Sequence, residues 1–186
     1  MDTSLARLSW QIIISFMTVS VLISGCGQQS TTPFVHNNFE QYEGWTITLP
    51  GALTSEKSHS GQWATKTDRG VEFSMGFTSL LSDWGEDRTA RLRAWVWLPH
   101  GRLPLVWIVV KVMRDGVEVH HQNLHLEQVV TRYRQWELVS LRLTFPADLL
   151  PSDKVQLFMW QPVQGNAEAV YMDDLVIEAP SSVFAY

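Results

Sequence analysis

Tryptophan and cationic residues recur at every second position in the middle of the chain, and their chemistry suits a ligand with both an apolar face and hydroxyl groups. In residues 91–98 they alternate with aliphatic residues, which is the periodicity of a β-strand. An indole offers a flat apolar surface for the C–H face of a sugar ring, and Arg and Lys donate hydrogen bonds that fix its orientation. The residues expected to contact such a ligand are Arg93, Trp95, Trp97, Trp107, Lys111 and Trp160.

We predict that these residues share one sheet face, because residues 105–113 repeat the alternation and place Trp107 and Lys111 away from the aliphatic side. An aromatic-rich face is typical of a glycan platform, of a protein interface, or of a second core covered by a loop such as residues 80–88. An accessible concave surface lined by Arg93, Lys111 and Gln156 would favour the first. The sequence leaves all three open.

The first 33 residues have the layout of a secretory signal followed by a lipid attachment site. Arg7 precedes an apolar run at residues 12–23, and Ile23-Ser24-Gly25-Cys26 resembles the bacterial lipobox. The alternative is a plain signal peptide or membrane anchor, although the run is short for a spanning helix. We predict a signal peptide at residues 1–25, lipid on Cys26, and a flexible tether at residues 26–33 that holds the domain on the bacterial envelope, at the outer membrane or cell surface.

Composition excludes several classes of function. Cys26 is the only cysteine, so the chain has no disulfide framework, zinc knuckle or cysteine nucleophile. The net charge is −5 and the cations form no basic stripe, which argues against a nucleic-acid partner. Nucleophile-elbow, phosphate-loop and zinc-protease motifs are absent from the sequence, so we predict a protein that is not an enzyme.

Short alternating or apolar runs separated by Gly, Pro, Asp and Ser predict an all-β fold, an antiparallel two-sheet sandwich spanning residues 34–180 with a tail at 181–186. In residues 71–77 the alternation predicts that Val71, Phe73, Met75 and Phe77 point inward. The nine predicted strands are residues 45–49, 63–66, 71–77, 91–98, 105–113, 117–126, 136–144, 155–161 and 170–178.

Asp115-Gly116 predicts a two-residue hairpin turn, because both residues tolerate positive φ. This register places Lys111 opposite His120 and Trp107 opposite Leu124, with polar residues beside Trp107. It would also put His121 on the core face, which indicates a β-bulge further from the turn.

The order of local motifs resembles the galactose-binding-like jelly rolls of the carbohydrate-binding module superfamily, over about residues 34–178. The motifs are Asn38-Phe-Glu40, Gly44-Trp45, His59-Ser-Gly61, the Trp-rich strand, Trp136 and Tyr171-Met-Asp-Asp-Leu175. The resemblance implies a jelly-roll domain that binds a glycan without catalysis. We therefore expect a polysaccharide partner. The competing hypothesis is a structural or protein-interaction subunit of an envelope assembly that uses the same face.

The same resemblance implies one structural calcium. Glu40 and Asp173 match its carboxylate ligands, and backbone carbonyls around Ser58 and Gly61 would complete the shell. The alternative is that both carboxylates accept backbone N–H bonds at strand ends.

Overall fold

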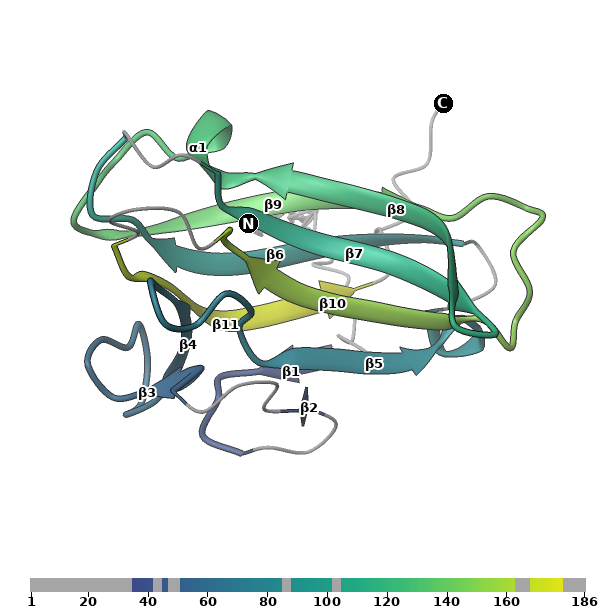
Figure 1. Ribbon diagram of the computed structural model, residues 1–186, viewed down its shortest axis with the longest axis horizontal. Coiled ribbons are helices and arrows are strands. Elements are labelled where there is room, and N and C mark those ends of the chain that lie inside the picture. Colours follow the sequence, from purple (N-terminus) through teal and green to yellow (C-terminus); the bar gives the residue numbers. More distant parts are fainter. Residues whose placement is uncertain are drawn as a thin grey trace, which may run out of the picture.

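The computed structural model describes residues 35–41, 45–46, 51–84, 88–101, 105–162 and 168–178, which form two antiparallel sheets stacked as a sandwich. Sheet A has the order β3-β4-β11-β6-β9, with β1 also pairing with β11. Sheet B has the order β2-β5-β10-β7-β8. Figure 1 shows β8, β7, β10 and β5 side by side in one layer and β9, β6 and β11 in the other. The predicted all-β, two-sheet sandwich is confirmed.

Most predicted strands are present, and two of them, β9 and β11, have the predicted bounds. Sheet A consists of β1 Val35–Asn37, β3 Leu53–Thr54, β4 Ala64–Thr67, β6 Thr89–Trp97, β9 Trp136–Thr144 and β11 Val170–Glu178. Sheet B consists of β2 Trp45–Thr46, β5 Gly76–Leu80, β7 Trp107–Arg114, β8 Val117–His125 and β10 Lys154–Trp160. A 3₁₀ turn at Leu81–Trp84 and a short helix, α1 Leu126–Val129, complete the described elements.

The predicted lipid site at Cys26, the tether and the C-terminal tail lie outside the described residues. Within them, no helix has the length and apolar character needed to cross a membrane.

The aliphatic face of each long strand forms the core, as the alternation predicts. Ala94 and Val96 of β6 are fully buried, and so are Ile108 of β7 and Leu157 of β10. Burial of this apolar surface is the main favourable term in folding. The remaining face of each sheet points away from the sandwich.

The prediction of a single aromatic face is wrong, because β6 and β7 belong to opposite sheets. β6 lies between β11 and β9, whereas β7 lies between β10 and β8. The inner faces of the two sheets meet in the core, so Trp95 and Trp107 point out of opposite sides of the molecule. Alternation identifies residues on the same strand face, but it does not identify which strands are neighbours.

The β7–β8 hairpin contains both the predicted turn and the predicted bulge. Asp115 and Gly116 have φ values of 51° and 84°, and the bulge follows between Val112 and Met113. Beyond it Lys111 pairs with His121 and Trp107 with His125, so the predicted partners His120 and Leu124 are wrong. The bulge turns His121, Asn123 and His125 to the outer face of sheet B.

Residues 71–77 differ from the predicted strand, which begins only at Gly76. Val71 and Met75 are buried, and Phe77 packs against the core, as predicted. Phe73 instead bridges Trp160 on the outer face of sheet B, because the chain before Gly76 is irregular.

Candidate functional site

Three rows of side chains cross the outer face of sheet B, set by the pairing register of β8, β7 and β10. Successive rows are two residues apart along each strand, or about 7 Å. The aromatic row contains His125, Trp107, Trp160 and Phe73. The middle row contains Asn123, Val109 and Phe158. The polar row contains His121, Lys111, Gln156 and Thr78.

The rows line two hollows, of about 300 and about 320 Å³, which share Phe73, Lys111 and Phe158. Because they share these walls, we treat them as one feature, the sheet B trough. Each hollow is at the lower end of the size range of small-molecule sites. Of the predicted ligand-binding residues, the trough brings together Trp107, Lys111 and Trp160.

The rings of the trough hold one another in place. Trp107 and Trp160 have centroids 5.0 Å apart at an angle of 58°, and Phe73 meets Phe158 edge-on at 5.6 Å. The ring centroid of His125 lies 4.5 Å from that of Trp107 on the other side. Trp160 Nε1 donates a 2.9 Å hydrogen bond to a Glu72 carboxylate oxygen, which fixes the orientation of the indole. A ligand would therefore meet a preorganised aromatic wall.

Two buried polar atoms of residues that line the trough have no hydrogen-bond partner among the described residues. They are Trp107 Nε1, a donor, and Asn123 Oδ1, an acceptor, and both are buried. A buried polar group without a partner costs about 1–3 kcal/mol. Because both atoms are buried, a ligand lying on the surface of the trough does not reach them.

The predicted residues of β6 lie on the outer face of sheet A, where a loop covers the two indoles. His59 stacks on Trp95 with centroids 4.0 Å apart and rings 13° from parallel. Lys57 Nζ lies 4.5 Å from the centre of the Trp97 ring. Arg93 pairs with a Glu178 carboxylate at 3.1 Å. Residues 57–60, rather than 80–88, therefore cover this face in part, and both indoles stay half-buried.

The four predicted calcium residues do come together, around the loop at residues 58–63, which we call the clasped loop. Asp173 Oδ2 accepts hydrogen bonds from the backbone N–H groups of His59 (2.7 Å) and Ser60 (3.1 Å). Glu40 Oε1 accepts bonds from the N–H groups of Gln62 (2.6 Å) and Trp63 (2.7 Å). The two carboxylates therefore hold opposite halves of the loop.

Ser58 and Gly61 close the clasped loop, since Ser58 Oγ donates to the Gly61 carbonyl at 3.1 Å. Gly61 has φ = 58°, and a Cβ at this position would overlap the Glu40 carboxylate. Glycine is thus required both by the backbone conformation and by the close approach of Glu40.

The hydrogen bonds of the clasped loop match the alternative, in which Glu40 and Asp173 accept backbone N–H bonds. Asp173 is fully buried, and this burial raises the pKa of its carboxyl to about 6 even though three backbone N–H groups donate to it. Among the described residues neither Asp173 nor Glu40 has a lysine or arginine partner, and no cluster of three or more His, Cys, Asp or Glu side chains could hold a metal. Two carboxylates and nearby carbonyls fit the oxygen preference of calcium. Calcium binding stays a prediction.

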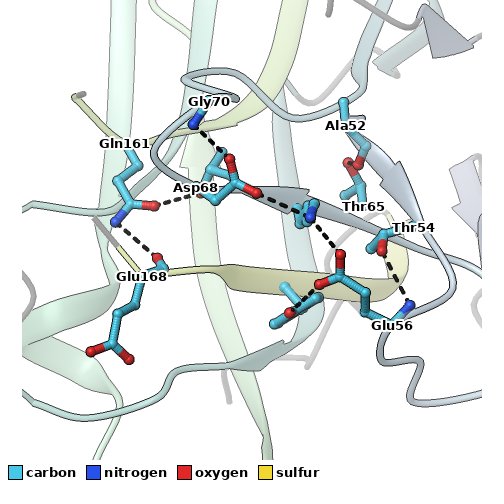
Figure 2. Close-up of polar contacts among 11 residues, drawn as sticks. Ala52, Thr54, Glu56, Thr65, Asp68, Gly70, Gln161 and Glu168 are labelled. Carbon is cyan, nitrogen blue, oxygen red and sulfur yellow. Dashed lines mark hydrogen bonds and ion pairs between the residues drawn. The ribbon is translucent and has the colours of Figure 1, made fainter. Parts of the chain in front are cut away.

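A second charged network links Glu56 and Asp68 through the lysine between them (Figure 2). Lys66 Nζ pairs with Glu56 at 2.8 Å and with Asp68 at 3.0 Å. The Tyr171 hydroxyl donates to the other Glu56 oxygen at 2.8 Å. Burial, followed by this bond to Glu56, raises the pKa of Tyr171 to about 12. The network supports Tyr171 against Trp97, and we assign it a structural role.

Sequence reasoning missed Phe73, Asn123 and His125 as lining or neighbouring residues of the trough. Phe73 follows an alternating pattern that the structure breaks. Asn123 and His125 reach the trough only because of the bulge. The sequence does contain a signal for Asn123 and His125: without a bulge, the polar side chain of His121 would lie on the core face.

Neither family models nor curated proteins match the chain. Solved structures do. A xylan-binding CBM22-1 domain from Paenibacillus barcinonensis Xyn10C is 17% identical, with a TM-score of 0.53 over 80% of this chain and 94% of that one. The C-terminal family 22 module of Clostridium thermocellum Xyn10B is 12% identical, with a TM-score of 0.53 over 81% and 95%. A family 16 carbohydrate-binding module is 17% identical, with a TM-score of 0.54 over 80% and 100%.

Identities this low are evidence of a shared fold alone. The chain has the antiparallel two-sheet jelly-roll fold of carbohydrate-binding modules.

Proposed function

We propose that this domain binds a polysaccharide along the sheet B trough and does not modify it. The observation that carries the proposal is the row of half-buried rings, Trp107, Trp160 and Phe73, beside the polar side chains of Lys111 and Gln156. Pyranose rings combine apolar C–H faces with hydroxyl groups, and the trough offers a surface for each. Proteins of the same fold include modules described as xylan-binding.

The expected affinity is modest. An indole buries about 150–250 Å², which corresponds to roughly 4–6 kcal/mol at about 25 cal/mol per Å². Most of this is offset by immobilisation of the glycan and by desolvation of polar groups. Dissociation constants between about 1 mM and about 1 μM follow, equivalent to about −4 to −8 kcal/mol.

The groups at the trough suit binding better than catalysis. Glu72 accepts the Trp160 N–H, and Glu118 pairs with His121 Nδ1 at 2.9 Å. The trough thus presents aromatic rings and hydrogen-bonding groups rather than an activated nucleophile or a free acid–base pair.

We further propose that lipid on Cys26 holds the domain on the bacterial envelope, and that Glu40 and Asp173 hold one calcium ion. Calcium would supply the positive charge that the described side chains do not offer to these carboxylates, and would tie β1 and β11 to the clasped loop.

The test compares two tryptophans that point outward from opposite sheets. A glycan array with the wild type first identifies a bound polysaccharide, and titration calorimetry then compares Trp160→Ala with Trp97→Ala. We expect Trp160→Ala to weaken binding about tenfold or more, equivalent to about 1.4 kcal/mol, and Trp97→Ala to retain the affinity of the wild type. Melting temperatures of both variants control for lost packing.

Two results would contradict the proposal. One is equal loss of glycan binding in both variants at equal stability. The other is an array on which no glycan binds, which would favour the competing role of the face in protein interaction.

A further inference from the structure

We infer that the polysaccharide bound in the trough is acidic, with sugar carboxylates that pair with Lys111. This inference deepens the proposed function and rests on it. Lys111 lies where the two hollows join, so a chain occupying the trough must pass its ammonium group.

Lys111 is half-buried and has no carboxylate partner within the part of the chain that the structure describes. Its Nζ lies 5.4 Å from the centre of the Phe158 ring, and among the described residues no carboxylate is within ion-pair distance. Lys66, the half-buried lysine of sheet A, instead pairs with two carboxylates. The chain as a whole carries an excess of acidic residues, 19 against 14 basic ones. A ligand anion could therefore form an ion pair with this ammonium group in the apolar trough, although the protein as a whole is acidic.

The groups around Lys111 leave this charge available. From β8, His121 faces it, and His121 is engaged by Glu118 at 2.9 Å. From β10, Gln156 is its cross-strand neighbour, and exposed Lys154 adds a second cation two residues away. From β5 comes only the uncharged Thr78, paired with Gln156.

The position of Lys111 also fits a sugar that stacks on the aromatic row. Phe158 is one row, about 7 Å, from the Trp107–Trp160 pair, and the ammonium lies over Phe158. A glycan lying on both indoles would bring the carboxylate of the same or the next sugar toward Lys111. Gln156 and Thr78 would then meet its hydroxyl groups.

The test uses matched pairs of polymers that differ only in charge: glucuronoxylan and polygalacturonate, each against its carboxyl-reduced form. The full-length chain is kept in mild detergent so that its apolar N-terminal segment stays soluble. Affinity is measured for the wild type, Lys111→Met, Lys111→Arg and, as a matched control, Arg142→Met, which removes one exposed cation from the opposite sheet.

We expect the wild type to prefer one acidic polymer over its reduced form about tenfold, with Arg142→Met and Lys111→Arg keeping that preference and Lys111→Met losing it. The preference should also fall in about 1 M salt, where the Debye length is about 3 Å. A preference that survives in Lys111→Met overturns the inference. Equal wild-type binding to both forms of every pair overturns it and leaves the proposed function intact. Binding to neither form of any pair overturns the inference, whereas the proposed function is overturned only if the glycan array also shows no bound glycan.

Discussion

Replacing Asp173 by Asn should raise the stability of the metal-free protein, relative to the wild type, as pH rises from acid to neutral. The folded-state pKa of Asp173 is about 6, above the value of about 3.9 for an unfolded chain. The folded state therefore binds this proton more tightly, and the contribution of Asp173 to stability falls as pH rises from about 4 to about 6. A difference of about 2 in pKa corresponds to roughly 3 kcal/mol at neutral pH.

The asparagine side chain in Asp173→Asn carries no charge to desolvate, so the stability of this variant should lack the pH dependence. The substitution also replaces one acceptor oxygen with an NH₂ group that faces a backbone N–H, which costs roughly 1–3 kcal/mol at every pH. The cost of the lost acceptor is the same at every pH. The effect of the charge is therefore measured by how the difference in free energy of unfolding between Asp173→Asn and the wild type changes with pH.

The assay is urea unfolding of both proteins at several pH values between about 4 and about 7 in the presence of a chelator. We expect the free energy of unfolding of the variant, relative to that of the wild type, to rise by up to roughly 3 kcal/mol across this range. If this difference in free energy of unfolding stays constant, or falls as pH rises, burial does not raise the pKa of Asp173. Added calcium should reverse the trend for the wild type alone, because a bound cation favours the ionised carboxylate, and a hundredfold excess over its dissociation constant adds about 2.7 kcal/mol.

Two further predictions concern the lipid anchor and the clasped loop. Metabolic labelling with a palmitate analogue should tag the wild type but not Cys26→Ala, and equal labelling of both would exclude this cysteine as the attachment site. Gly61→Ala should destabilise the domain by clearly more than the roughly 1–2 kcal/mol of left-handed strain, because its Cβ would displace the Glu40 carboxylate and break its hydrogen bonds to Gln62 and Trp63. Gly116 has φ = 84° and open space around it, so Gly116→Ala should show only the cost of the left-handed backbone conformation. An equal loss of stability in the two variants would contradict a close approach between Gly61 and Glu40.

The sequence predicts local features well because they depend on neighbours along the chain. β9 and β11 have the predicted bounds, since their alternation runs over nine residues each. The Asp115-Gly116 turn follows from the φ preferences of its two residues, and the bulge follows from the polar His121. β1 and β3, with three and two residues, are too short to show a period.

The candidate site is harder to predict because it depends on which strands are neighbours. The chain passes from sheet A to sheet B between β6 and β7, so these two strands never pair, and alternation alone contains no information about this step. Trp95 and Trp97 look like the indoles of the trough in sequence, but residues 57–60 pack over them. That cover depends on Glu40 and Asp173, which lie near opposite ends of the domain in sequence.

If the domain functions as proposed, a polysaccharide lies on the outer face of sheet B. The most direct test is to follow the indole N–H resonances of ¹⁵N-labelled protein while a glycan that binds on the array is added. We expect the Trp107 and Trp160 signals to shift with saturation, while those of Trp95 and Trp97 stay in place. Saturable shifts confined to Trp95 and Trp97 would contradict this expectation.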